Sequence, residues 1–410
     1  ITLVEIVGRT AQQVFHRLEL VVGAGCLDGE RVRRDIHDAR AFDLLPISKL
    51  KFRLISQTAA DLNEAEGAIW DLNSHSGSDD PDIIADAMLN IEALASVRMD
   101  GRQPSARDIL IQRVEDKLRK HEPNDCVARF ERDRASLVYA LGRANEACTV
   151  PMLCDIHEHV LPAKHGGMGG MMRQGLTQVG GSRYHTFGTA YLMPRPENIE
   201  PLMQDLASFL SLEDIMVVEQ AGIAHAQLIN IHPFDRGNGK MARAAVHFAL
   251  FFRGIAPHYL LPITPVIATS SHDYVAGISA CAFEESTPPD VMAQSVNAWL
   301  SYFATCCLKA VSISAGFMQE CKSFISAYER VLSVRKDSAT RQLLHALPAL
   351  PVFSAQMAAD YLNCSFKRAS DACKTLDELG IVSQLNEGKR NRIYASEEAI
   401  GAYMHIDALR

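Results

Sequence analysis

The sequence predicts a mainly α-helical protein with one small β-hairpin and a small C-terminal domain of helices and strands. Three observations lead to this fold class. Apolar residues recur at helical spacing along most of the 410 residues. One glycine-rich stretch, 170–181, alternates its side chains as a short hairpin does. Residues 338–410 combine helical periods with two short alternating segments.

Length, composition and charge are those of a globular protein with more than one domain. A chain of 410 residues exceeds what one hydrophobic core usually organises, so we expect two or three domains. With 48% hydrophobic and 22% charged residues, the composition is that of an ordinary folded protein. The net charge of −8 argues against broad attraction to nucleic acid or to an anionic membrane. The nearest approach to the roughly 18 apolar residues that span a bilayer is 244–252, so no membrane association is expected.

The ten cysteines are scattered along the chain without a Cys-x-x-Cys pair. This usage favours a reducing compartment, in which thiols are buried as small apolar groups. We therefore predict a cytoplasmic protein.

The helical periods divide the chain into three predicted regions. Residues 1–125 form an N-terminal helical region, residues 126–320 form a helical core, and residues 338–410 form the last domain. A helix over 313–336 leads into that last domain. The helices expected in the core lie near Ser136–Glu146, Met152–Val160, Ile199–Leu210, Leu212–Ile231, Lys240–Arg253 and Asp290–Ala310.

The most informative stretch of the core is His232-Pro-Phe-Asp-Arg-Gly-Asn-Gly-Lys-Met-Ala-Arg243. Pro233 ends the preceding helix. Gly237-Asn238-Gly239 then supplies a tight loop in which backbone N–H groups can approach an anion. A second helix begins near Lys240, so the loop lies at a helix N-terminus, where the helix dipole favours negative charge.

The side chains of this stretch indicate phosphate chemistry. Lys240 and Arg243 share one face of the first helical turn, where cations are unfavourable for the helix dipole unless an anion lies between them. His232 has an ordinary pKa that suits proton transfer near neutral pH. The plain alternative is a helix end followed by a turn. The combination of a base, an anion loop and paired cations instead favours a polyphosphate site in which His232 activates a nucleophile.

The same stretch resembles the signature of the Fic (Fido) family, His-Pro-Phe-x-(Asp/Glu)-Gly-Asn-Gly-(Arg/Lys)-x-x-Arg. The resemblance implies a largely helical fold and transfer of AMP from ATP to a hydroxyl side chain of a target protein. It makes His232 the general base and Phe234 the anchor that holds the loop. The loop would cradle the α- and β-phosphates, and the two cations would hold the β- and γ-phosphates and the departing pyrophosphate. The nucleotide-binding residues implied in this way are Phe234, Gly237, Asn238, Gly239, Lys240 and Arg243.

One position departs from the family pattern. The acidic residue that holds Mg²⁺ in the family falls on Arg236, and an acid stands one place earlier, at Asp235. A metal that bridges phosphates needs a hard oxygen ligand, so Asp235 is the candidate ligand of Mg²⁺. Alternatively, Arg236 neutralises phosphate charge without a metal.

Gly170–Gly181 resembles the flap of the family, a β-hairpin that lies over the active site and pairs with an extended stretch of the target. The alternative is a flexible glycine loop with no partner. The following Ala190–Glu197 resembles the family segment that leads into the next helix, which favours the flap. The flap residues that we expect to dock the target are Arg173, Thr177, Gln178 and Val179.

Residues 92–101 resemble the inhibitory helix of Fic proteins, Ser/Thr-x-x-x-Glu-Gly, here with Ser96, Asp100 and Gly101. In the family the acid pairs with the last arginine of the signature and blocks productive placement of the γ-phosphate. The resemblance therefore implies that Asp100 restrains Arg243 within the chain. Asp is one methylene shorter than Glu, and a carboxylate–guanidinium pair depends on bidentate geometry, so a weaker restraint is expected. The alternative is an ordinary helix end capped by Gly101.

His225 is the other histidine of the predicted helix that precedes the signature. It lies on the same helix face as His232, two turns earlier. A zinc pair normally sits four residues apart with a third ligand nearby. We therefore predict a packed, hydrogen-bonded side chain rather than a metal ligand.

Residues 338–410 look like a winged helix. Ser354 is a suitable N-cap for the second helix, and Gly380 closes the third. The predicted elements are helices at Arg341–Leu347, from Phe353 and at Ser365–Leu379, and strands at Ile381–Leu385 and Arg392–Tyr394 around a wing at 386–391.

Such a domain is typical of DNA-binding proteins. However, residues 338–410 carry eight Lys and Arg against eight Asp and Glu, whereas a DNA-binding domain usually has a basic excess. Protein contact or homodimerisation is therefore favoured over DNA. The side chains that would contact DNA are Lys367, Arg368, Lys374, Lys389, Arg390 and Arg392.

These observations together predict a Fic-type protein adenylyltransferase (AMPylator), a nucleotidyltransferase restrained by its own N-terminal helix. ATP is its expected substrate and Mg²⁺ its expected cofactor, and the acceptor is a Ser, Thr or Tyr hydroxyl of a target protein. Two alternatives stay open. One is a related enzyme with other phosphate chemistry, such as removal of AMP or transfer of another nucleotide. The other is a non-catalytic regulator that binds nucleotide or DNA.

Overall fold

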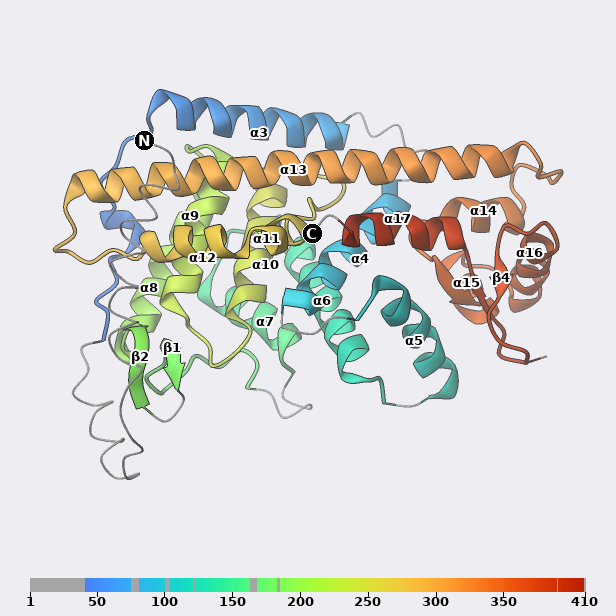
Figure 1. Cartoon of the computed structure of the whole chain (residues 1–410), viewed down its shortest axis with the longest axis horizontal. Coiled ribbons are helices and arrows are strands. Elements are labelled where there is room, and N and C mark those ends of the chain that lie inside the picture. Colours follow the sequence, from blue (N-terminus) through green and yellow to red (C-terminus); the bar gives the residue numbers. More distant parts are fainter. Residues whose placement is uncertain are drawn as a thin grey trace. The chain divides into compact units, whose positions relative to one another are not determined.

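The computed structural model describes residues 41–74, 81–99, 104–120, 122–162, 168–182, 185–388 and 390–408 (Figure 1). Most of these residues are helical, and the strands among them form one hairpin and one three-stranded sheet. The predicted mainly α fold is therefore confirmed. Among the residues singled out above, Asp100, Gly101 and Lys389 lie outside the described ranges.

The chain divides into two compact units that interleave along the sequence. The first unit takes in the chain up to Glu66, Ser136–Arg253 and Ser270–Thr305. The second takes in Gly67–Ala135, Gly254–Thr269 and Cys306–Arg410. Three helices contribute to both units, α3 (Ser56–Ser74), α6 (Asp125–Gly142) and α13 (Pro289–Glu329). The predicted three successive regions, 1–125, 126–320 and 338–410, stay a prediction, and α13 runs without a break through residue 320.

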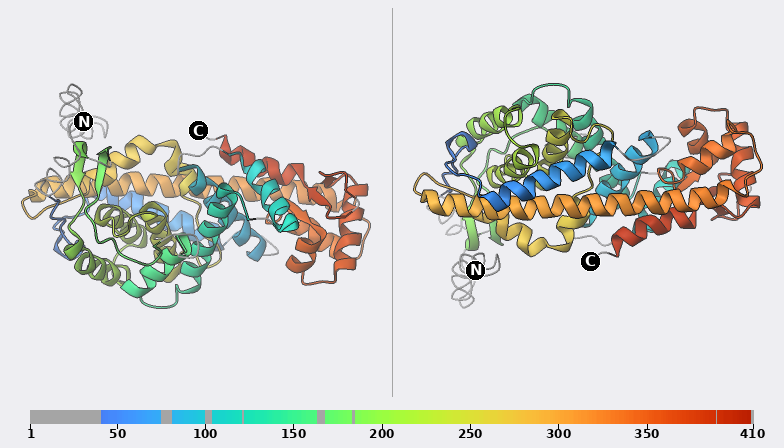
Figure 2. Two further views of the ribbon diagram at one scale, coloured as in Figure 1. Left: turned by 90° about the horizontal axis from the view of Figure 1, so that it is seen from below. Right: turned by 90° about the horizontal axis from the view of Figure 1, so that it is seen from above.

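Helix α13 is a single helix of 41 residues and can be followed along its length in Figures 1 and 2. The sequence predicted two helices here, 290–310 and 313–336, but the intervening Val311 and Ser312 do not break helical geometry. Among the described residues, α13 is also the one helix long and apolar enough, by length and composition alone, to cross a membrane. A core helix passes the same test, and α13 buries Trp299, Phe303 and Phe317. The nearest approach to a membrane span is thus α13 and not 244–252.

The first unit is built around α9 (Val217–Ile231) and α10 (Asn238–Phe252), most of whose side chains are buried. Helix α9 begins later than the predicted Leu212, because the Leu212 carbonyl accepts the side-chain N–H of Gln220 at 2.9 Å instead of a helical N–H. The elements that pack around this pair include η1 (Ile47–Lys49), α7 (Val150–Val160), α8 (Pro196–Leu210) and α12 (Ser271–Ala280).

The first unit also holds the predicted hairpin, made of β1 (Gln178–Ser182) and β2 (His185–Leu192). The strands are antiparallel, with Gln178 opposite Leu192 and a shift in register after Val179. The hairpin begins eight residues after Gly170, so the prediction that strand starts at the glycine-rich segment is wrong. Gly170 has a φ of 73°, a left-handed conformation that no strand residue adopts.

The second unit contains a three-stranded antiparallel sheet with β5 in the centre and β3 and β4 at its edges. Its elements are α4 (Pro81–Met99), α5 (Ala106–Arg119), α11 (Thr264–Thr269), α14 (Ala339–Ala346), β3 (Val352–Ser354), α15 (Ala355–Tyr361), α16 (Phe366–Glu378), β4 (Ser383–Gln384), β5 (Ile393–Ala395) and α17 (Glu397–Asp407).

The three helices and two strands predicted within 338–410 are present as α14, α15, α16, β4 and β5. The sequence missed strand β3, because Phe353 pairs with Tyr394 instead of starting a helix, and Ser354 caps α15 by accepting the Met357 N–H. It also missed α17, which Ser396 caps by accepting the Ala399 N–H. The winged-helix assignment itself stays a prediction.

Helix α4 is held within the second unit by buried polar contacts. The Asn90 amide donates to the Ala349 carbonyl at 3.1 Å and to the Tyr403 hydroxyl at 3.2 Å. Arg98 forms an ion pair with Asp407 at the end of α17. On another side of α4, the fully buried Glu92 carboxylate accepts the Thr264 N–H at 3.0 Å and so caps α11. The predicted inhibitory helix is therefore fixed to the C-terminal segment of the chain.

Candidate active site

The signature forms a six-residue loop, 232–237, between the end of α9 and the start of α10. His232 is the last residue of the helical hydrogen-bonding pattern, since its N–H donates to the Leu228 carbonyl at 3.1 Å. It has a φ of 50° and a ψ of 57°, the left-handed conformation that side chains other than glycine seldom adopt. A residue before proline is normally extended, so the His232 backbone is strained. Strain of this kind concentrates at functional sites.

The loop is closed by a reciprocal pair of hydrogen bonds between Asn238 and the backbone of Phe234. The Asn238 side-chain oxygen accepts the Phe234 N–H at 3.0 Å, and its amide donates to the Phe234 carbonyl at 2.7 Å. Both side chains are buried. Asn238 therefore shapes the loop with its side chain, which leaves its backbone N–H for the predicted contact with phosphate.

His157 of α7 holds the signature loop against α7, a role that the sequence did not reveal. Its ring stacks on Phe234, with 3.6 Å between ring centroids and 3° between planes. Its Nδ1 accepts the Gly170 N–H at 3.0 Å, so its Nε2 carries the proton and donates to the Arg236 carbonyl at 2.8 Å. Burial lowers the pKa of His157, which favours the same neutral form.

Gly237 is required where the loop enters α10. Its φ of 83° lies in the left-handed region. A Cβ at this position would lie 3.1 Å from Nε2 of His157 and 3.1 Å from a methyl group of Val160. The tight glycine turn that the sequence predicted is therefore present, and His157 sets how closely the loop approaches α7.

The first two turns of α10 carry the predicted anion-binding groups. Gly237 is its N-cap, and no side chain caps it. Lys240 is half-buried and Arg243 is buried. A Cβ on Gly239 would lie 3.4 Å from a guanidinium nitrogen of Arg243, so the arginine folds back over the start of its own helix. Its charge is thereby placed at the helix N-terminus.

The His232 ring is in the state that a general base needs. Its Nδ1–H donates to the Ile229 carbonyl at 3.3 Å, which leaves Nε2 as the proton acceptor. Burial lowers the pKa of His232, and the nearby Arg173 guanidinium lowers it further. The imidazole is therefore neutral at neutral pH.

Arg173 does not belong to the flap, so its prediction as a target-docking residue is wrong. It precedes β1 and is 1% exposed. Its guanidinium donates to the carbonyls of His232 at 2.7 Å, Gly175 at 2.8 Å and Pro194 at 2.6 Å. Burial lowers the pKa of Arg173 to about 10, so it stays charged at neutral pH. Its role is to hold the strained His232 backbone.

The other predicted flap residues lie where the hairpin begins. The Thr177 carbonyl accepts the Met193 N–H at 2.9 Å, just before β1. Gln178 and Val179 are the first two residues of β1, opposite Leu192 and Tyr191. The docking of a target by these residues stays a prediction.

Two further predictions concern metal and inhibition. Asp235 and Arg236 are both exposed, and in the described part of the chain no group of three or more His, Cys, Asp or Glu side chains is placed to hold a metal ion. Ser96 is buried within α4, while Asp100 and Gly101 lie outside the described residues. Binding of Mg²⁺ by Asp235 and the restraint of Arg243 by Asp100 both stay predictions.

His225 is a packed core residue, as predicted. It is fully buried in α9, and its Nε2 is 2.7 Å from the Tyr274 hydroxyl of α12. Its ring also stacks on Trp299 of α13.

The part of the chain that contains the signature is similar to proteins of a known family. Residues 147–250 match the model of the Fic/DOC family. The protein adenylyltransferase Fic of Nematostella vectensis is 31% identical over 116 residues, which are 28% of this chain and 25% of that protein. The protein adenylyltransferase fic-1 of Caenorhabditis elegans is 28% identical over 123 residues, 30% of this chain and 23% of that protein. The chain thus spans about a quarter of the length of these relatives.

A solved structure is similar to a larger share of the chain. The crystal structure of a Fic family protein from Desulfovibrio desulfuricans G20 covers 85% of this chain and 98% of its own, with a TM-score of 0.48 and 14% sequence identity.

We expect His157→Phe to loosen the signature loop. Phenylalanine keeps a ring against Phe234 but leaves the Gly170 N–H and the Arg236 carbonyl without their partner. The free energy of unfolding in urea should fall by ~1–3 kcal/mol, the cost of unsatisfied buried polar groups. His159→Phe is the matched control on the same helix, because its ring packs on Tyr139 and not on the loop. Equal stability losses in the two variants would contradict the assigned role.

Proposed function

Because residues 147–250 are a Fic/DOC family domain, we propose that the protein is an adenylyltransferase that transfers AMP from ATP to a Ser, Thr or Tyr hydroxyl of a target protein. One observation carries the proposal. A neutral histidine and a helix N-terminus with two cations in its first two turns stand at the two ends of one six-residue loop. The adenylyltransferases that match this chain support the same activity.

In this reaction His232 takes the proton of the target hydroxyl at Nε2. The hydroxyl oxygen then attacks the α-phosphorus of ATP. The bond from that phosphorus to the oxygen bridging to the β-phosphorus breaks, and pyrophosphate leaves with the electron pair. The hydrogen bond from Nδ1 to Ile229 keeps Nε2 available as the acceptor throughout.

The α10 N-terminus supplies the groups that hold the triphosphate. Backbone N–H groups of Asn238 and Gly239 lie in the first helical turn, where the helix dipole favours an anion. Arg243 and Lys240 add two positive charges that stabilise the charge developing on the leaving pyrophosphate. Asn238 takes part through its backbone, since its side chain is bound to Phe234.

We propose Mg²⁺ as the cofactor, with Asp235 as its protein ligand. Mg²⁺ usually keeps several waters and binds through one or two carboxylates together with substrate phosphates, so one exposed carboxylate on the loop fits this pattern. When bound, the ion would neutralise phosphate charge. The neighbouring Arg236 supplies a fixed positive charge to the same loop.

Arg236 also supports a second candidate function. A cation at the position where the family has its acidic residue changes the charge next to the phosphates. This change favours an enzyme that removes AMP from a modified protein or transfers another nucleotide. A panel of labelled nucleotides separates these activities from transfer of AMP.

We propose further that the inhibitory-like helix over 92–101 restrains the enzyme, with Asp100 paired to Arg243. The buried Ser96 and the polar contacts that fix α4 support a rigid base for such a brake.

For the C-terminal segment we propose protein contact or dimerisation. The exposed Lys367, Arg368 and Lys374 of α16 alternate with the exposed Asp371 and Glu378, which weakens attraction to DNA. We also propose a cytoplasmic location. All nine described cysteines are free thiols, which suits a reducing compartment.

We expect [α-³²P]ATP to label the wild-type protein or an added target, and His232→Ala to reduce the labelling rate by about 10²–10⁴-fold, the usual contribution of a general base. His272→Ala is the control, because that histidine is exposed on α12. Labelling that survives in His232→Ala would remove the proposed base.

The labelling rate should fall only at acidic pH. Because burial lowers the pKa of His232 below its ordinary 6.5, the neutral, active ring persists to a lower pH than in a free histidine. In the unfolded chain His232 takes up a proton near its ordinary pKa of 6.5, whereas in the folded chain it does so only at lower pH. The free energy of unfolding therefore also decreases as the pH falls below 6.5. Unfolding measured at each pH separates the two effects. A half-maximal rate above pH 6.5 in folded protein would be inconsistent with this assignment.

Variants of Asp100 should change labelling in opposite directions. Asp100→Asn removes the charge that pairs with Arg243 and should raise the rate about three- to tenfold, the size of a typical coupling between sites. Asp100→Glu restores the longer acid of the family and should lower the rate. Asp82→Asn, in the first turn of α4, is the control for loss of a charge from that helix. Unchanged rates in both Asp100 variants would argue against a brake.

A further inference from the structure

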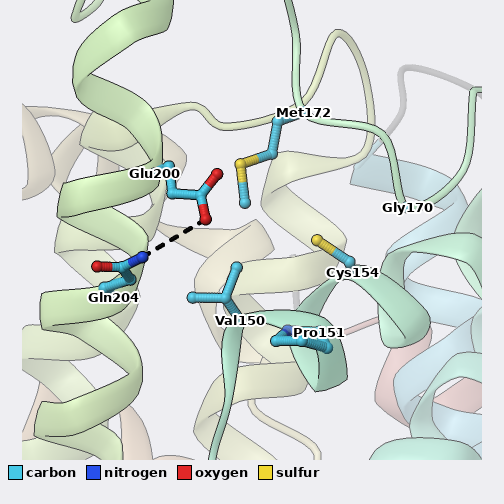
Figure 3. A pocket seen from close by; sticks show the side chains of 7 residues that line it. All are labelled: Val150, Pro151, Cys154, Gly170, Met172, Glu200 and Gln204. Atoms are coloured by element: carbon cyan, nitrogen blue, oxygen red, sulfur yellow. Dashed lines mark hydrogen bonds between the residues drawn. The ribbon is translucent and has the colours of Figure 1, made fainter.

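A pocket of about 550 Å³ opens between α7, α8 and the loop that carries Gly170 and Met172 (Figure 3). One wall is apolar and consists of Val150, Pro151 and Cys154 from α7 together with Met172. The other wall is polar and consists of Glu200 and Gln204 from α8. Figure 3 shows the Met172 side chain extending from the loop into the pocket and the Glu200 carboxylate pointing toward the same space from α8.

The charge in and around the pocket is negative. Glu200 is exposed, and its carboxylate accepts one hydrogen bond within the pocket, from the Gln204 amide at 3.4 Å. A carboxylate offers about four acceptor sites, so the remaining ones can bind a further donor. Asp155 and Glu200 both act on Cys154, and with burial they raise the pKa of its thiol.

The pocket shares a loop with the candidate active site. Gly170 lines it, and the N–H of the same residue is bound by His157. His157 in turn binds the Arg236 carbonyl and stacks on Phe234. Two residues, Gly170 and His157, therefore connect the pocket to the signature loop.

We propose that this pocket binds a basic side chain, Lys or Arg, of the substrate protein. The aliphatic stem of such a residue suits the wall of Val150 and Met172, and its charged head suits Glu200, because long basic side chains bury the stem and keep the head polar. Glu200 and Met172 are then determinants of target specificity. The proposal rests on the proposed function, which supplies a protein substrate.

Binding is tested on the whole 410-residue chain, labelled with ¹³C at its methionine methyl groups and followed by NMR. The Met172 resonance is assigned with Met172→Leu. N-acetyl-arginine amide is titrated against N-acetyl-citrulline amide, which has the same shape without the charge. We expect a saturable shift of Met172 with the arginine probe, and binding of the citrulline probe about three- to fivefold weaker, the size of an exposed charge pair.

Two variants on α8 sharpen the test. Glu200→Gln should abolish the preference for arginine over citrulline, whereas Glu197→Gln, an exposed acid in the first turn of the same helix, should keep it. Equal affinity for the two probes, no saturable shift, or an unchanged preference in Glu200→Gln would each overturn the proposal. Because the titration needs no ATP and no turnover, its failure is distinguishable from failure of the labelling experiments.

Discussion

The candidate site depends on one imidazole ring, that of His157. Two other parts of the chain, the segment with Gly170 and the signature loop, meet on it. The ring accepts the Gly170 N–H, donates to the Arg236 carbonyl and stacks on Phe234. Because one nitrogen must accept and the other must donate, both bonds require the neutral ring with its proton on Nε2. The position of the signature loop against α7 therefore follows from the protonation state of a residue outside the signature.

A second constraint acts on the backbone of the loop. Arg173 is almost completely buried and offers its donors to backbone carbonyls at His232, Gly175 and Pro194. Such a guanidinium offsets the cost of the left-handed backbone at His232. The loop is thus held by a neutral histidine and by a buried cation. The side chains of Phe234 and Asn238 close it, since Asn238 is bound to the Phe234 backbone.

The sequence predicted those parts of the site that are local in the chain. The helix end at His232, the left-handed glycine at 237 and the helix with Lys240 and Arg243 all follow from residue types within twelve positions. The roles of His157 and Arg173 could not be predicted, because their partners lie up to 79 and 59 residues away. The hairpin was placed too early for a related reason. The stretch 170–181 alternates as a hairpin does, whereas Gly170 itself makes a contact with α7 that local pattern does not encode.

The contacts of α4 bear on how this chain can be divided. Asn90, in the middle of α4, takes its partners from Ala349 and Tyr403, and Arg98 takes its partner from Asp407. A chain cut before residue 338 would remove these partners of Asn90 and Arg98 and expose the face of α4 that they cover. Residues 338–410 are therefore a packed part of the second unit and not an independent domain. Replacing them with the segment of another protein would also require the α4 residues that contact them.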